Sequence, residues 1–78
     1  MSIIQRAVDK AGKAGTVARA LRISRISVYE WIEKDRLPPG RVLALAELTG
    51  WEYTPHMLAP DRYPNPTDGL PLTVLGQA

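Results

Sequence analysis

The sequence predicts an all-α protein, a small bundle of about five helices followed by a proline-rich C-terminal segment. Apolar residues repeat at helical spacing in successive segments, glycine and proline mark the ends of these segments, and no pair of segments alternates convincingly like strands. The chain has 78 residues and no cysteine, so one compact core must form by apolar packing without disulfides.

The first helix is expected at about residues 2–11. Ser2 and Gln5 have the spacing of a capping box, and Gly12 supplies a stop. One face of this helix is apolar and carries Ile3, Ile4, Ala7, Val8 and Ala11. A second, shorter helix follows, and its apolar face carries Ala14, Val17, Ala18 and Leu21.

Ser24 is a good N-cap for a third helix at about residues 25–34, before the break at Pro38 and Pro39. Its inward residues are Val28, Trp31 and Ile32. A fourth helix is expected at about 40–49, with proline at its start and glycine after its end. Its inward residues are Val42, Leu45, Ala46 and either Thr49 or Leu48.

The C-terminal third begins with one helical turn at 54–58, capped by Thr54 and ended before Pro60, whose Leu58 is expected to cover the core. Proline and glycine then exclude regular helix, so residues 1–60 are predicted as the domain and 61–78 as a tail. The tail is expected to be disordered or docked on a partner, for example in a dimer contact. Residues 72–75 suit a short strand if a partner offers an edge.

The charges favour a polyanionic partner for the N-terminal half. The formal net charge is only +2, but residues 1–36 hold eight basic and four acidic side chains, whereas 37–78 hold two and four. The longest apolar run, Val42–Ala46, is too short for a membrane span, and the charged N-terminus does not resemble a signal peptide. We therefore expect a soluble, cytoplasmic protein without a membrane partner.

Only Arg22, Ile23 and Ser24 separate the second and third helices. So short a junction makes the helices cross steeply, with Ile23 between them, as in a helix-turn-helix. Residues 14–33 resemble the Cro/CI-type helix-turn-helix regulators of phages and bacteria, with Ala18 at the small-residue position. The apolar positions of that motif are occupied by Val17, Ile23, Val28 and Trp31.

The resemblance extends to the YdaS-type Cro-like proteins of prophages over about residues 1–64, including the Pro-Asp-x-Tyr-Pro sequence at 60–64. It implies a lambda repressor-like DNA-binding fold and a transcriptional repressor that binds a palindromic operator as a homodimer, at the nucleoid of a bacterial host cell. Two positions depart from the family pattern. Arg22 replaces a glycine that takes the left-handed conformation, at a cost of about 1 kcal/mol, and Ala14-Gly15-Thr16 replaces a polar start of the second helix.

The third helix has the chemistry of a recognition helix. Arg25 suits guanine O6 and N7, Ile26 a thymine methyl, and Glu30 the N4 amine of cytosine. The predicted base-contacting residues are Ser24, Arg25, Ile26, Tyr29 and Glu30. The predicted phosphate-contacting residues are Lys13, Thr16, Arg19, Arg22 and Ser27.

Other functions have weaker support. The sequence contains no nucleophile–base pair or phosphate-binding glycine loop, and His56 is the single histidine, so no enzyme, cofactor or metal site is expected. Trp51 and Tyr53 are expected to pack under the C-terminal segment. The alternative function is an antitoxin-like module that binds a toxin-like protein through this segment. If the chain forms a homodimer, the contact is expected either in the segment after Gly50, including Leu70–Leu75, or on the fourth helix.

Overall fold

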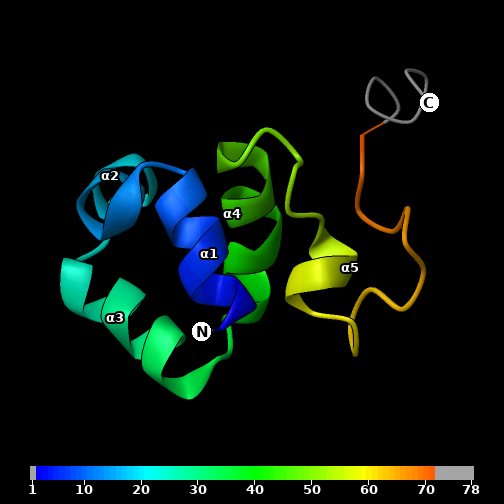
Figure 1. Ribbon diagram of the computed structural model, residues 1–78, viewed down its shortest axis with the longest axis horizontal. Helices are drawn as coiled ribbons and strands as arrows, with labels where there is room; N and C mark the ends of the chain where they lie inside the picture. Colours follow the sequence, from blue (N-terminus) through cyan, green and yellow to red (C-terminus); the bar gives the residue numbers. More distant parts are fainter. Residues whose placement is uncertain (1, 72–78) are drawn as a thin grey trace.

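A computed structural model describes residues 2–71, which form five α-helices and one 3-10 turn and contain no strand (Figure 1). The elements are α1 (Ile3–Lys10), α2 (Lys13–Leu21), α3 (Arg25–Lys34), η1 (Pro39–Arg41), α4 (Val42–Leu48) and α5 (Pro55–Leu58). This confirms the predicted helical bundle. The strand considered for residues 72–75 lies outside the described residues.

The helix ends follow the local signals in the sequence. The Ser2 hydroxyl accepts a hydrogen bond from the Gln5 N–H at 3.1 Å, and the Thr54 hydroxyl accepts one from the Met57 N–H at 3.2 Å. Each of these bonds satisfies a backbone donor that the first turn of a helix leaves without a partner. The fourth helix starts later than predicted, because its first turn is the tighter 3-10 turn η1, closed by Arg41 N–H to the Pro38 carbonyl at 2.9 Å.

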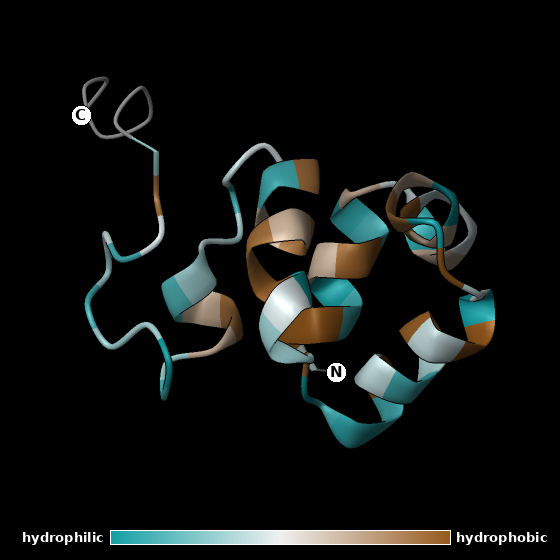
Figure 2. Cartoon of the chain, turned by 180° about the vertical axis from the view of Figure 1, so that it is seen from behind, coloured by the Kyte–Doolittle hydropathy of each residue, from teal (hydrophilic) through white to brown (hydrophobic). Residues whose placement is uncertain are grey.

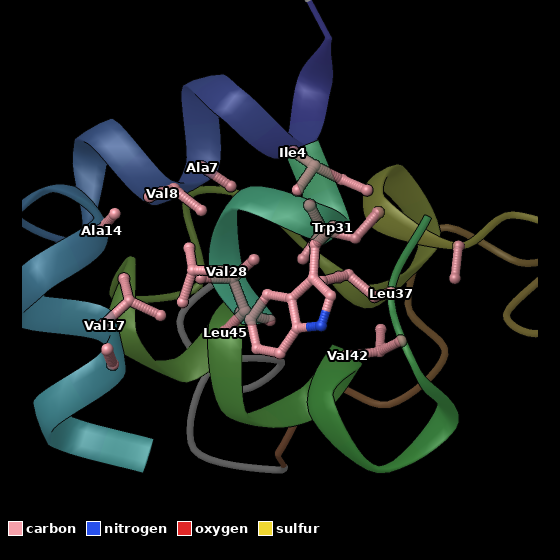
Figure 3. Packing of buried hydrophobic residues seen from close by; sticks show 14 residues of the cluster. Ile4, Ala7, Val8, Ala14, Val17, Val28, Trp31, Leu37, Val42 and Leu45 are labelled. Atoms are coloured by element: carbon pink, nitrogen blue, oxygen red, sulfur yellow. The ribbon is translucent and has the colours of Figure 1, made fainter. Parts of the chain in front are cut away.

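The core lies between α1 and the other helices, since α1 contacts α2, α3, α4 and α5. Figure 3 shows side chains from α1, α2, α3 and α4 meeting there, among them Val8, Val17, Val28 and Leu45, all fully buried. Trp31 is 6% exposed and belongs to this cluster, as its spacing predicted. Figure 2 shows hydrophobic residues concentrated in the central helices, whereas the C-terminal segment is mostly hydrophilic.

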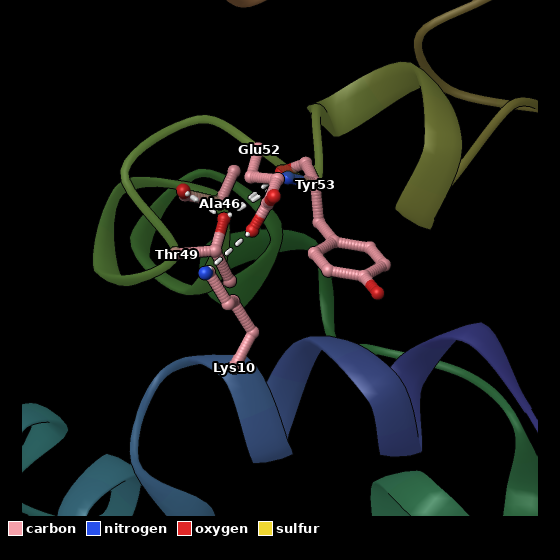
Figure 4. Close-up of polar contacts among 5 residues, drawn as sticks. All are labelled: Lys10, Ala46, Thr49, Glu52 and Tyr53. Atoms are coloured by element: carbon pink, nitrogen blue, oxygen red, sulfur yellow. Dashed lines mark hydrogen bonds and ion pairs between the residues drawn. The ribbon is translucent and has the colours of Figure 1, made fainter.

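The turn between α4 and α5 is held by Thr49, which is buried, whereas Leu48 is half-buried. The Thr49 hydroxyl donates to the Ala46 carbonyl at 2.7 Å and accepts from the Tyr53 N–H at 3.1 Å (Figure 4). An ion pair of 3.0 Å between Lys10 and Glu52 connects α1 to the same turn. Trp51 and Tyr53 are half-buried against the core.

The start of the C-terminal segment packs on its own domain. Tyr63 is half-buried against the core, its N–H donates to the Ala59 carbonyl at 2.9 Å, and its carbonyl accepts from His56 Nδ1 at 2.7 Å. Gly69 lies against Leu43 and Pro55. Packing therefore continues beyond residue 60, whereas a dimer contact of residues 61–78 stays a prediction. In the described residues, no helix has the length and apolar character to span a bilayer, and no group of three or more His, Asp or Glu side chains could hold a metal.

Candidate nucleic-acid interface

The turn between α2 and α3 has helix-turn-helix geometry. Arg22 has φ 58° and ψ 47°, which confirms the left-handed conformation predicted at this position. The Ile23 N–H donates to the Ala18 carbonyl at 3.0 Å, and the Ile23 side chain packs half-buried against the core. The backbone of the turn and the Ile23 side chain thus fix the angle between the two helices, which pack against each other.

The start of α3 is capped as predicted. The Ser24 hydroxyl accepts a hydrogen bond from the Ser27 N–H at 3.3 Å. Ser24 is exposed, and its hydroxyl hydrogen can still donate to an outside acceptor, whereas Ser27 is half-buried. The two serines therefore differ in how well they are placed for contact with a ligand.

The outer face of α3 carries four of the five predicted base-contacting residues, and the fifth, Ser24, caps the helix. Val28 and Trp31 are buried, which turns the opposite side of the helix toward solvent. Ile26 is 69% exposed and Tyr29 is 55% exposed, and these are the two most exposed large hydrophobic residues of the described chain. Ser24, Arg25 and Glu30 are also exposed. Ile26 and Tyr29, three positions apart, thus form an exposed apolar pair between polar side chains, as binding surfaces do.

One residue of this face was missed by the sequence reasoning. Glu33 is exposed and stands seven residues after Ile26 and three after Glu30, so the three share one helical stripe. The same spacing is readable in the sequence and could have found it. The carboxylate of Glu30 lies 3.9 Å from Lys34 Nζ, whereas Glu33 forms no ion pair within residues 2–71.

Arg25 extends along the start of α2. A Cβ atom added to Gly15 would lie 3.7 Å from Arg25 Cδ. Gly15 was not among the predicted site residues. The structure thus brings the first residue of α3 to the first turn of α2.

The predicted phosphate-contacting residues lie on α2, in the turn after it and in the first turn of α3. Lys13, Thr16, Arg19 and Arg22 are exposed, and Ser27 is half-buried. Thr16 lies over Gly12, because a Cβ at Gly12 would be 3.0 Å from Thr16 Cγ2. The ion pairs within residues 2–71 are Lys10–Glu52 and Glu30–Lys34, so none of these cations, nor Arg25, is neutralised by a carboxylate of the described chain.

The fold and this surface define a class, the small helix-turn-helix proteins of Cro/CI type. The family model described as bacterial toxin YdaS matches residues 4–67. The chain therefore belongs to the YdaS family, a Cro/CI-like, phage-associated family. No curated protein and no solved structure gives a significant match to the chain.

Proposed function

We propose that the protein is a sequence-specific, double-stranded DNA-binding transcriptional regulator, a Cro-like repressor that reads the major groove with α3. The observation that carries the proposal is the outer face of α3, where Ile26 is 69% exposed beside an Arg25 that has no ion pair within residues 2–71. An α-helix fits the major groove, and a guanidinium beside an apolar side chain can bind guanine and a thymine methyl. The chain acts by binding, without a cofactor and not as an enzyme.

The surface divides into residues that read bases and residues that hold the backbone. Arg25, Ile26, Tyr29 and Glu30 lie on the exposed part of α3 and are assigned to base edges, together with Ser24 at its cap. The exposed cations of α2 and the turn are assigned to phosphates, which set the register of the helix without selecting a sequence. The phosphate-binding set is Lys13, Thr16, Arg19, Arg22 and Ser27.

The regulator acts as a homodimer on a palindromic operator, in the cytoplasm of a bacterial cell and at its nucleoid. One α3 helix covers only a few base pairs, and two copies related by a two-fold axis place two such helices about 34 Å apart, one DNA turn, in successive major grooves. Membership of a phage-associated, Cro-like family supports this arrangement.

Selection from a random pool of duplex DNA at near-physiological salt tests the proposal. We expect the surviving duplexes to share a palindromic motif whose half-sites are about one helical turn apart. Enrichment of nothing beyond salt-sensitive background would overturn sequence-specific binding while leaving the helical fold intact.

A second candidate function is partnership with another protein through the C-terminal part of the chain, as an antitoxin-like or toxin-like module. Two observations favour it: the family is described as a bacterial toxin, and Leu43 on α4 and Met57 on α5 are 43% and 40% exposed. Leu43 also touches Gly69 of the C-terminal segment. Leu43→Ser and Met57→Ser should abolish such a partnership and leave binding of one half-site unchanged, whereas Ile26→Ser should do the reverse.

A further inference from the structure

A second group of exposed cations lies on the flank of α3 that faces away from α2. An open groove of about 270 Å³ is lined there by three cations, Lys34, Arg36 and Arg62, with Trp31 and Pro39 among its walls. The three cations also line an adjoining hollow, between the end of α3 and the start of the C-terminal segment. None of the three is among the residues assigned above to DNA.

Three cations and one carboxylate line the groove itself, and the adjoining hollow adds two carboxylates and no further cation. Glu30 lines the groove and lies 3.9 Å from Lys34 Nζ, and Asp35 and Asp61 line the adjoining hollow. Arg36 and Arg62, both exposed, form no ion pair within residues 2–71. Within the described residues, the two guanidinium groups are therefore the cations of the groove that no carboxylate pairs directly.

Both arginines are held on ordered backbone. The Arg36 N–H donates to the Trp31 carbonyl at 3.1 Å, immediately after Asp35, whose left-handed φ of 54° ends α3. The Arg62 N–H donates to the Ala59 carbonyl at 3.0 Å, next to the His56 contact with Tyr63 that fastens the C-terminal segment. The fold thus brings Arg62, which is 26 positions after Arg36, to the same groove.

The groove and α2 lie on opposite sides of the face that reads DNA. Successive residues of a helix turn by about 100°, so Arg25 falls on one side of Ile26 and Lys34 on the other. The Arg25 side faces Gly15 of α2, and the Lys34 side faces Arg36 and Arg62. A helix in the major groove of DNA has a phosphate strand on each side, since the major groove is about 12 Å wide and bordered by both strands.

We infer that Arg36 and Arg62 bind phosphates of the DNA strand opposite the one that α2 meets. The inference rests on the proposed function and extends it, because it makes the segment after α5 part of the DNA interface. In this arrangement the two arginines contact the phosphate strand on one side of the major groove. Lys13, Thr16 and Arg19 contact the phosphate strand on the other side. A guanidinium presents several N–H donors to phosphate oxygens, which suits it to this contact.

The experiment measures affinity against salt concentration for the full chain, with the duplex selected from the random pool and a scrambled duplex of equal length. Each of Arg36→Gln and Arg62→Gln should lower the slope of log affinity against log salt by about 0.9, equally for both duplexes. The loss should therefore be about three- to fourfold larger at 50 mM than at 200 mM salt. Arg62→Lys should keep the slope because it keeps the charge.

Lys10→Gln is the matched control, since it removes the same charge from a side chain already paired with Glu52 at 3.0 Å. Slopes for Arg36→Gln and Arg62→Gln equal to that of Lys10→Gln would overturn the inference and leave the proposed function standing. If the unaltered protein binds neither duplex, the proposed function and the inference fail together. Thermal unfolding of each variant separates loss of contact from loss of fold.

Discussion

Arg25 lies across Gly15, with its Cδ atom 3.7 Å from the point that a Cβ at Gly15 would occupy. The contact joins the first residue of α3 to the first turn of α2, the two elements that the proposed function places on bases and on phosphates. A Cβ atom at Gly15 would make ordinary van der Waals contact with Arg25 Cδ at this distance, so it fits without displacing the arginine. The Arg25 stem thus runs beside the first turn of α2, with space for a methyl group between them.

Gly15→Ala should stabilise the protein. Glycine inside a helix costs roughly 0.5–1 kcal/mol relative to alanine, and the added methyl group would make ordinary contact with Arg25. We expect the free energy of unfolding in urea to rise by about that amount. Gly69→Ala is the contrasting variant and should destabilise by at least about 1 kcal/mol, because Gly69 has φ 79° and its Cβ would stand 2.9 Å from Pro55 Cγ. Equal effects of the two changes would contradict the structure at both positions.

Arg25→Ala should weaken binding to the selected duplex by roughly 1–3 kcal/mol and relax the preference at one base pair. Arg19→Ala, on the adjacent helix, should weaken binding to all sequences alike and lower the salt slope by about one. Competition binding with single-base variants of the selected duplex measures both effects. An equal loss for selected and random DNA with Arg25→Ala would show that the assignment of the base-reading face is wrong.

Arg22 should separate stability from DNA binding. Its left-handed backbone, with φ 58°, costs an L-residue about 1 kcal/mol that glycine does not incur. Arg22→Gly should therefore raise the free energy of unfolding by about this amount while it weakens binding to all duplexes. Arg22→Ala removes the same charge and keeps the strain, so it should match Arg22→Gly in DNA binding and fall below it in stability. A stability no higher for the glycine variant would refute the strain.

Thr49→Val should destabilise the turn between α4 and α5. The variant keeps the shape of the side chain but leaves the Tyr53 N–H without its acceptor at 3.1 Å and removes the bond to Ala46. An unmade hydrogen bond in a buried setting costs about 1–3 kcal/mol. Thr49→Ser keeps the hydroxyl and should recover the hydrogen-bond part of this loss, as measured by chemical denaturation. A stability unchanged by Thr49→Val but lowered by Thr49→Ser would assign the role of Thr49 to methyl packing instead of hydrogen bonding.

The sequence predicts the helices well because their signals are local. Ser2, Ser24 and Thr54 accept from the backbone N–H three residues later, and the periodic apolar residues of α1 and α3 form the core. The left-handed Arg22 is likewise predicted by its place in the turn. Features that depend only on residues three or four positions apart can therefore be predicted from the sequence.

Contacts between distant residues are not readable in this way. The approach of Arg62 to Arg36 depends on how the segment after α5 folds back, which His56 and Tyr63 fix through a bond across seven positions. His56 is half-buried, and the sequence around it gives no sign of this bond. The contact of Arg25 with Gly15 depends on the packing of two helices. Residue types suggest the base-reading set, but only the fold shows what flanks it.

Glu33 tests whether the whole outer stripe of α3 meets DNA. It is exposed in line with Ile26 and Glu30, and its carboxylate has no ion pair within residues 2–71. A carboxylate near phosphates opposes binding, and two unit charges 4 Å apart in water interact by about 1 kcal/mol. Glu33→Gln should thus tighten binding to selected and scrambled duplexes alike, by up to about fivefold at low salt. Glu47→Gln, an exposed residue of α4, makes the same charge change away from α3 and should have little effect. If both variants tighten binding equally, the gain reflects net charge, and α3 does not enter the groove with this stripe toward the DNA.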